Sequence, residues 1–203
     1  MKKVFFITAT NTNVGKSYAA EVFLKKFANK RKKVGYFKPI ETGIKKQPLD
    51  GTRLLHITKR LNSSFHFSIN DIVPYQFKLA ASPFVAKKDN KIDIETIFIQ
   101  ATTLLEKCDV LIVEGAGGLM VPILKNYFMV DLIKEFQNRF NSKTILISSS
   151  ILGGINDTLL SQNILKKYKI NYKWYINLYK DKKKFKQITL PFYKEYFDKI
   201  SYL

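Results

Sequence analysis

The segment that most constrains the fold lies near the N-terminus, where a short apolar run at residues 4–8 leads into the loop ATNTNVGKS at 9–17. An amphipathic stretch begins directly afterwards, at Tyr18. This order predicts a strand, a loop and a helix. A helix N-terminus carries unpaired backbone N–H groups and a partial positive charge, so it binds anions such as phosphate. We therefore expect a phosphate site at the end of the first strand.

The last three residues of this loop suit three tasks at a nucleotide site. Gly15 lets the backbone approach a phosphate, Lys16 supplies a mobile positive charge, and Ser17 offers a hydroxyl to magnesium. The motif G-x-x-x-x-G-K-[ST] nevertheless requires a glycine where this chain has Thr10. Because a bare GKS triplet is common by chance, an ordinary helix start remains open, and other segments must decide.

Short apolar runs alternate with helical patterns along the chain. Strands are predicted at 4–8, 34–37, 109–113 and 144–148, with a further strand ending at Asn177, and helices at 17–29, 50–61, 93–107, about 128–140 and about 156–168. Strands that alternate with helices pair in parallel, and parallel sheets bury both faces. We therefore expect one α/β domain over residues 1–203, a mostly parallel, doubly wound sheet with helices on both faces, of the phosphate-loop NTPase type.

Two acidic residues stand at the start of predicted helices. Asp50 and Asp93 each precede a helical pattern, and a side-chain oxygen there can accept a hydrogen bond from the first turn. Either residue can therefore be an N-cap, and for Asp50 a role at the metal remains open beside it. Residues 74–84 between the two helices, PYQFKLAASPF, are expected to be irregular.

Composition narrows the class of protein. At 203 residues and 46% apolar content the chain can bury one core, and its apolar runs are too short to span a bilayer. The first run leads straight into the loop without a secretory signal, so we expect a cytoplasmic protein. Cys108 is a predicted apolar filler, and His56 and His66 lack partners at ligand spacing, so no zinc site is expected.

The net charge of +19 is typical of proteins that bind nucleic acid. Only four of the basic residues are arginines, at positions 31, 53, 60 and 139. Lysine lacks the bidentate fork with which arginine holds phosphate. We favour lysines on solvated faces and expect neither a nucleic-acid nor a membrane partner.

Ligands of parallel sheets bind beyond the carboxyl ends of the strands. The loops at 8–17, 38–43, 114–118 and 148–156 should therefore converge. Lys38 lies between a predicted buried strand and Pro39, an unusual place for a merely solvated charge. Glu114 precedes glycines at another strand end, where its carboxylate could hold magnesium or accept loop N–H bonds.

Four further polar residues near these loops have ordinary explanations. A helix cap is enough to explain Asp50, and a turn is enough to explain Thr42. Asn156 could simply cap the next helix, and Asn177 could simply end a strand. None of them indicates a ligand without further support.

Five motifs occur in the order and approximate spacing of one enzyme family. They are T-x-T-x-V-G-K-S from Thr10, G-Y-x-K-P-I-x-T-G from Gly35, V-E-G-A-G-G from Val113, L-G-x-I-N from Leu152 and a last strand ending in Asn177. In this joint order the chain resembles dethiobiotin synthetase over about residues 4–177. Ala9 stands where that family has the first glycine of its loop, and Asn11 where an aspartate is usual.

The resemblance implies a magnesium-dependent ligation in biotin biosynthesis. 7,8-Diaminopelargonic acid takes up CO2 as a carbamate, ATP phosphorylates the carbamate to a carbamic-phosphoric anhydride, and the second amine closes the cyclic urea of dethiobiotin. ADP and phosphate leave. The resemblance also implies a homodimer with the substrate site near the subunit interface.

The same resemblance implies roles for individual residues. Lys16 and Lys38 would be catalytic, and Ser17, Asp50 and Glu114 would hold Mg²⁺. The ATP site would comprise Thr12, Asn13, Val14, Gly15, Lys16, Ser17, Glu114, Gly115, Ala116, Gly117 and Asn177. The amine substrate would contact Thr42, Lys38, Gly118 and Asn156.

Two departures from the family concern the nucleotide base. Asn177 precedes Leu178 where the family usually has aspartate, and the chain stops soon after TLPFYKEYF, where the family closes the base pocket with a longer segment. Phosphate contacts do not distinguish bases. We therefore expect weak ATP binding, or a site shared with other nucleoside triphosphates.

Two other phosphate-loop classes are alternatives. A partitioning-type ATPase that binds DNA or membrane usually carries an additional lysine at the start of the loop, where this chain has ATNTN. A glutamine-dependent cobyrinate-type relative is expected to carry an amidotransferase domain that this sequence lacks. Neither class explains KPIETG at 38–43.

Overall fold

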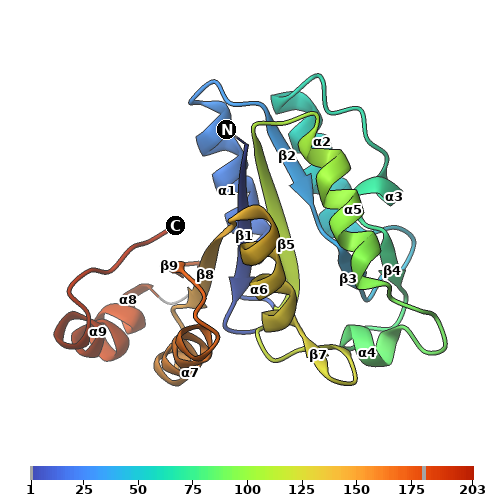
Figure 1. Cartoon of the computed structure of the whole chain (residues 1–203). Coiled ribbons are helices and arrows are strands. Elements are labelled where there is room, and N and C mark those ends of the chain that lie inside the picture. Colours follow the sequence, from blue (N-terminus) through green and yellow to red (C-terminus); the bar gives the residue numbers. More distant parts are fainter. Residues whose placement is uncertain (1, 180–181) are drawn as a thin grey trace.

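The computed structural model describes residues 2–179 and 182–203. At its centre is a five-stranded parallel sheet in the order β2-β5-β1-β8-β9 (Figure 1). The strands are β1 (Lys3–Ala9), β2 (Val34–Phe37), β5 (Val110–Gly118), β8 (Lys143–Ser149) and β9 (Tyr172–Asn177). The parallel pairing confirms the expected α/β architecture.

Helices cover both faces of this sheet (Figure 1). On one face lie α1 (Lys16–Ala28) and α2 (Leu49–Leu61), which pack against each other, and on the other lie α5 (Ile94–Leu105) and α6 (Met129–Phe140). A further helix, α7 (Gly154–Lys167), connects β8 to β9. Because both faces of the sheet are covered, the strands are continuous apolar runs rather than alternating ones.

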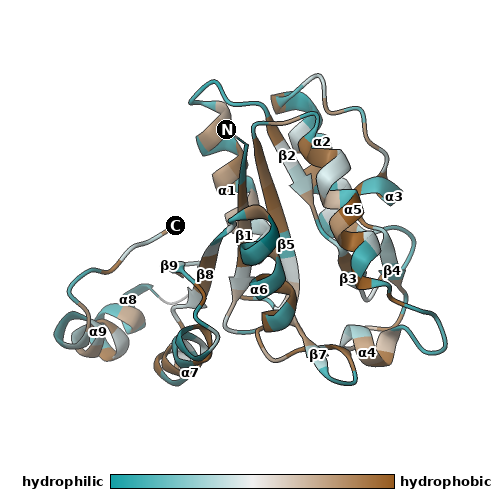
Figure 2. Cartoon of the chain, viewed as in Figure 1, coloured by the Kyte–Doolittle hydropathy of each residue, from teal (hydrophilic) through white to brown (hydrophobic). Residues whose placement is uncertain are grey.

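The core lies between the sheet and these helices. The Phe6 ring on β1 lies 5.2 Å from the Phe136 ring on α6, which in turn lies 5.0 Å from the Phe98 ring on α5. In Figure 2 the inner strand β5 is largely brown, whereas teal gathers on the outer helices and turns. Cys108 is buried in this core, and burial raises the pKa of its thiol to about 12, which confirms the expected apolar filler.

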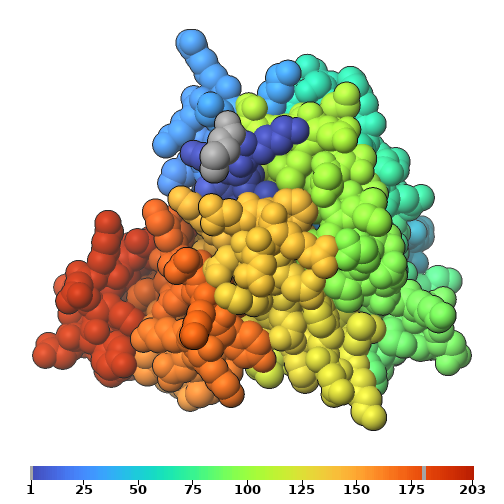
Figure 3. All heavy atoms as spheres, viewed as in Figure 1, coloured from blue at the N-terminus to red at the C-terminus, as the bar shows by residue number. Residues whose placement is uncertain are grey.

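Shorter elements surround the central sheet. They are β3 (Ile40–Thr42) parallel to β4 (Tyr75–Phe77), β6 (Pro122–Leu124) antiparallel to β7 (Tyr127–Phe128), α3 (Ile69–Ile72), α4 (Pro83–Ala86), α8 (Lys182–Lys184), a π-helix (Phe185–Thr189) and α9 (Leu190–Tyr196). The C-terminal segment forms one flank of the molecule beside α7 (Figure 3). Among the described residues no helix is both long and apolar enough to cross a membrane.

Three local predictions were wrong. The helix α2 begins at Leu49 with Pro48 as its N-cap, so Asp50 lies in the first turn and caps nothing. Proline has no backbone N–H to donate, so it suits the position just before a helix, and the helix starts one residue earlier than expected. Residues 74–84 are not irregular, because they include β4 and the start of α4, both too short to show a periodic pattern. The expected loop at 114–118 is the end of β5, which pairs with β1 as far as Gly118.

The N-cap of α5 is confirmed. The Asp93 side chain accepts a hydrogen bond from the Glu95 backbone N–H at 3.0 Å. The helix ends at Leu105, two residues before the expected end.

Candidate active site

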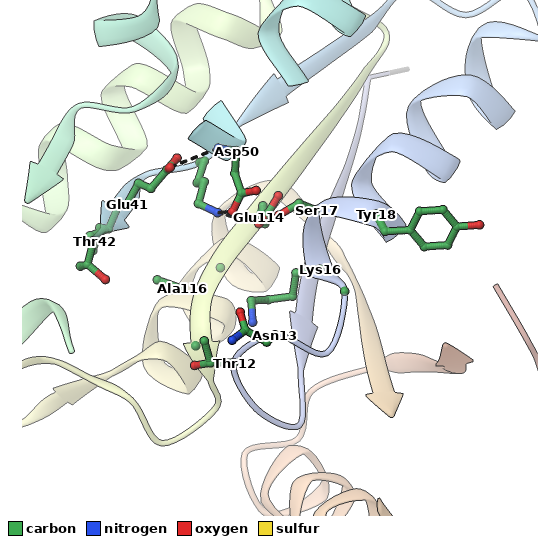
Figure 4. A pocket seen from close by; sticks show the side chains of 15 residues that line it. Thr12, Asn13, Lys16, Ser17, Tyr18, Glu41, Thr42, Asp50, Glu114 and Ala116 are labelled. Atoms are coloured by element: carbon green, nitrogen blue, oxygen red, sulfur yellow. Dashed lines mark hydrogen bonds and ion pairs between the residues drawn. The ribbon is translucent and has the colours of Figure 1, made fainter. Parts of the chain in front are cut away.

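A cavity of about 370 Å³ opens beyond the carboxyl ends of β1, β2 and β5 (Figure 4). Three of the four segments expected to converge line it, together with the start of α2. The lining residues are Thr12, Asn13, Gly15, Lys16, Ser17, Tyr18, Lys38, Ile40, Glu41, Thr42, Asp50, Glu114, Gly115, Ala116 and Gly117. Most of the predicted site residues are therefore brought together.

The fourth segment, residues 148–156, does not line this cavity, so its expected convergence was wrong. It follows β8, which lies on the opposite side of β1 from β5 and β2. Asn156 is exposed in the first turn of α7. Val14, Gly118 and Asn177 are buried but do not line the cavity either.

The phosphate loop owes its shape to two left-handed residues, Asn13 at φ 58° and Gly15 at φ 103°. Gly15 is the N-cap of α1 and contributes no side-chain cap, so the first-turn N–H groups of the helix are available to an anion. A Cβ on Gly15 would lie 2.2 Å from Asn177 Nδ2, which donates a hydrogen bond to the Val14 carbonyl at 2.9 Å. Glycine is thus required at position 15 both by the backbone angle and by Asn177.

Ala9 occupies an ordinary strand position. It is the last residue of β1, pairs with Gly118 and Ile147, and is not among the residues with positive φ. The close approach occurs instead at Gly118, where a Cβ would lie 3.1 Å from the Thr10 carbonyl oxygen. Alanine at position 9 therefore introduces no left-handed strain into the phosphate loop.

Lys16 folds back over the loop that precedes it. Its ammonium donates a hydrogen bond to the Asn11 carbonyl at 3.0 Å, and its side chain is buried. Burial lowers the pKa of Lys16 to about 8 against the opposing charge of Glu114, and Lys38 lowers it further. A phosphate bound at the loop would favour the charged form of Lys16 again.

Lys38 lines the cavity and lies between two carboxylates. Its Nζ is 2.7 Å from Glu114 Oε1 and 3.0 Å from Asp50 Oδ2. Burial disfavours the charged form, but Glu114 and Asp50 outweigh burial and raise the pKa of Lys38 above its ordinary value. Lys38 is therefore a fixed cation, whereas Lys16 is poised to titrate.

Glu114 is the centre of the site and is almost fully buried. It accepts hydrogen bonds from Ser17 Oγ at 2.7 Å, from Lys38 Nζ at 2.7 Å and from the Tyr36 hydroxyl at 2.8 Å. Tyr36 was not predicted from the sequence. The available signal was its spacing, because residues 36 and 38 are two apart on and after β2 and so share a face.

Glu41 is the second functional residue that the sequence analysis missed. It lines the cavity and accepts hydrogen bonds from the backbone N–H groups of Asp50 and Gly51, at 3.2 and 3.0 Å. Burial raises the pKa of Glu41, while Lys38 opposes that shift. Its signal was an acidic residue inside KPIETG, next to the predicted substrate contact Thr42.

A second cavity, of about 480 Å³, adjoins the first. Both cavities are lined by Thr12, Asn13, Thr42, Ala116 and Gly117. The second is completed by Ala80, Ala81, Ser82, Pro83 and Val121. The segment that was expected to be irregular therefore forms one wall beside Thr42.

Comparison with known sequences decides the family. Residues 3–184 match the AAA domain family. The chain is 46% identical over 193 residues to ATP-dependent dethiobiotin synthetase BioD of Sulfurovum sp. (strain NBC37-1), covering 95% of this chain and 90% of that protein. The chain belongs to the ATP-dependent dethiobiotin synthetases. The resemblance drawn from the five motifs is thereby confirmed.

Two further dethiobiotin synthetases match over similar shares of both chains. Identity is 37% over 196 residues with BioD of Wolinella succinogenes, covering 95% of this chain and 89% of the relative. Identity is 35% over 205 residues with BioD of Helicobacter pylori (strain J99), covering 98% and 91%. The family match therefore extends over nearly the whole chain.

Solved structures of other phosphate-loop proteins share the fold. A plasmid partition protein from Borrelia burgdorferi has a TM-score of 0.59 at 13% identity, over 100% of this chain and 89% of that one. The MinC:MinD cell division protein complex of Aquifex aeolicus has a TM-score of 0.55 at 19% identity, over 91% and 72%. At such identities the likeness concerns the fold alone, so these structures do not support the partitioning alternative.

Proposed function

We propose that this dethiobiotin synthetase family member joins 7,8-diaminopelargonic acid, CO2 and ATP into dethiobiotin with the help of Mg²⁺. The observation that carries the proposal is the pair of buried lysines, Lys16 and Lys38, beside a phosphate loop and the buried carboxylate of Glu114. Phosphoryl transfer depends mainly on alignment and charge neutralisation, which these groups supply without a protein nucleophile.

The ATP phosphates would lie along the loop from Thr12 to Ser17 and the first turn of α1. The backbone N–H groups there would bind phosphate oxygens, and Lys16 would leave the Asn11 carbonyl to bind the transferred phosphoryl group. Gly115, Ala116 and Gly117 line the same cavity. Asn177 would act indirectly, because its side chain holds the loop at Val14.

The residues proposed for magnesium fit that ion. Ser17 Oγ lies 2.7 Å from Glu114 Oε1, and both Glu114 and Asp50 contact the Lys38 ammonium, so three hard oxygen ligands face one corner of the cavity. The part of the chain that the structure describes contains no cluster of three His, Cys, Asp or Glu. Mg²⁺ needs none, because one or two carboxylates with phosphates and water suffice. Bound magnesium would neutralise charge on the phosphates.

Lys38 would stabilise the carbamate and the phosphoryl group as charge moves between them. Its raised pKa keeps it protonated at neutral pH, so it supplies a cation and not a base. Thr42 would contact the amine substrate, since it lies where the two cavities meet. Gly118 would shape this site from beneath the lining residues.

The homodimer belongs to the proposal as well. Asn156 lies outside the cavity of its own chain, next to Ile151 and Leu152, whose exposed fractions are 41% and 84%. A second copy packed on this segment would cover those apolar side chains and give Asn156 a place near a substrate site. We further propose one domain, a cytoplasmic location, and neither nucleic-acid nor membrane partners.

The proposal is tested by supplying purified protein with labelled bicarbonate. Acid-stable labelled product should form only when diaminopelargonic acid, Mg²⁺ and a nucleoside triphosphate are all present. Running the assay with each of four nucleotides measures base preference, which we expect to be weak. The Lys38→Ala variant is the matched control, because it removes one cation from the cavity and should abolish turnover.

Two outcomes would contradict the proposal. One is the absence of labelled product at saturating substrates. The other is full activity in Lys38→Ala. That result would contradict the catalytic role of Lys38 but not the reaction itself.

A further inference from the structure

We propose that Glu41 is a positioning residue, which fixes the first turn of α2 and thereby holds the Asp50 carboxylate against the Lys38 ammonium. Glu41 belongs to β3 and follows Lys38 by three residues, whereas Asp50 belongs to α2. The loop that joins β3 to α2 would otherwise leave these two elements to move independently. The structure connects them through one carboxylate (Figure 4).

The contacts of Glu41 are those of a helix cap supplied from outside the helix. Its Oε1 accepts from the Asp50 N–H at 3.2 Å, and its Oε2 accepts from the Gly51 N–H at 3.0 Å. The N-cap residue, Pro48, has no side-chain cap hydrogen bond of its own. Glu41 therefore binds N–H groups that the first turn cannot satisfy internally, and its negative charge suits the positive end of the helix.

Gly51 makes this arrangement possible. A Cβ at position 51 would lie 3.2 Å from Glu41 Oε2 and 2.5 Å from Val73 Cγ2. A larger residue would clash with the Val73 side chain and displace the start of α2 from its place beside Glu41. The glycine is thus explained by a close approach between two elements.

Lys38 and the Ser17 hydroxyl bind the Asp50 carboxylate, but packing restrains it little. Its side chain is 46% exposed, whereas the side chains of its partner Lys38 and of Glu114 are 7% and 1% exposed. Packing holds Lys38 and Glu114 in place, but the position of the Asp50 carboxylate follows its backbone. Fixing that backbone sets where the carboxylate meets Lys38, and a small misplacement of a charged group in such a site lowers the rate sharply.

The test compares Glu41→Ala and Glu41→Gln with the wild type and with Asp50→Asn. The Glu41→Ala variant should lower kcat by about tenfold or more with less than about a threefold change in the KM for ATP, because the phosphate loop is untouched. Glutamine keeps one acceptor oxygen, so Glu41→Gln should recover part of the loss. In the double variant, Glu41→Ala should add little to the loss caused by Asp50→Asn, because both changes act through the same carboxylate.

Hydrogen exchange supplies a reading that does not depend on turnover. The amides of Asp50 and Gly51 should exchange about tenfold faster or more in Glu41→Ala, and amides later in α2 should be unchanged. Asp93→Ala is the matched control. It also removes a carboxylate that accepts a hydrogen bond from a helix N-terminus, that of α5, but Asp93 does not line the cavity. It should lower the melting temperature and leave kcat unchanged.

Several results would overturn the inference. They are wild-type kcat in both Glu41 variants, fully additive losses in the double variant, unchanged exchange at residues 50 and 51, or a loss of kcat in Asp93→Ala equal to that in Glu41→Ala. If Glu41→Ala does not fold, kcat and the hydrogen exchange of residues 50 and 51 are measured in Glu41→Gln alone, and wild-type values there would overturn the inference.

Discussion

At the residue scale, the two lysines of the site differ in how their charge is held. Lys38 forms ion pairs with Glu114 and Asp50, which hold its pKa above the ordinary value of a lysine. The pKa of Lys16 is lowered to about 8, because burial outweighs the opposing charge of Glu114. Lys16 is therefore the residue whose protonation should control how the free enzyme responds to pH.

We predict that the affinity of the free enzyme for ATP falls as pH rises through about 8, the pKa of Lys16. Below that pH Lys16 is charged and attracts phosphate, and above it the neutral amine does not. Titration calorimetry with ATP across this range measures the change. In Lys16→Arg the dependence should vanish, since a guanidinium stays protonated. A flat profile in the wild type, or the same slope in Lys16→Arg, would show that another group titrates.

At the scale of elements, the junction of β1, the phosphate loop and α1 rests on a left-handed glycine. Gly15 and Gly153 are both helix N-caps with positive φ, at 103° and 88°. A Cβ on Gly153 would meet nothing within 4 Å, whereas one on Gly15 would lie 2.2 Å from Asn177 Nδ2. Substituting Gly153 therefore measures backbone strain alone, whereas substituting Gly15 measures the same strain together with the clash against Asn177.

We predict that Gly153→Ala costs about 1–2 kcal/mol of unfolding free energy, the penalty of a left-handed alanine. Gly15→Ala should cost that amount plus a further ~1–3 kcal/mol, because Asn177 must leave the loop. It should also abolish measurable nucleotide binding, which Gly153→Ala should retain. Urea denaturation and calorimetry measure both quantities. If both variants lost the same unfolding free energy, the Asn177 side chain would move aside at no energetic cost, and the predicted steric term would be wrong.

At the scale of the whole molecule, the charge of +19 is the feature that a small-molecule enzyme does not require. We predict that any binding to duplex DNA falls steeply with salt, is absent near about 0.15 M salt and does not respond to nucleotide. Fluorescence anisotropy over a salt series measures this. DNA affinity that survives at that salt and depends on ATP would revive the partitioning alternative and contradict our proposal.

The sequence by itself determined the elements and most of the site. Apolar runs and helical spacing are local properties, so the five strands of the main sheet and its large helices were predicted from them. Most observed bounds lie within two residues of the prediction, but β5 continues to Gly118, five residues beyond its predicted end. The topological rule for parallel sheets then brought Lys16, Lys38 and Glu114 to one edge. Those residues are recognisable because charge beside glycine at a strand end is unusual.

Only the tertiary structure decided which groups those residues contact. The partners of Glu114 lie 97, 78 and 76 positions away at Ser17, Tyr36 and Lys38, and no local pattern encodes such distances. The first turn of α2 likewise contacts Glu41, whose carboxylate accepts hydrogen bonds from Asp50 and Gly51 across a loop. Because β8 pairs with β1 on the side away from β5 and β2, residues 148–156 do not line the cavity. Short-range patterns specify elements, whereas strand order and packing place side chains from distant elements within hydrogen-bonding distance.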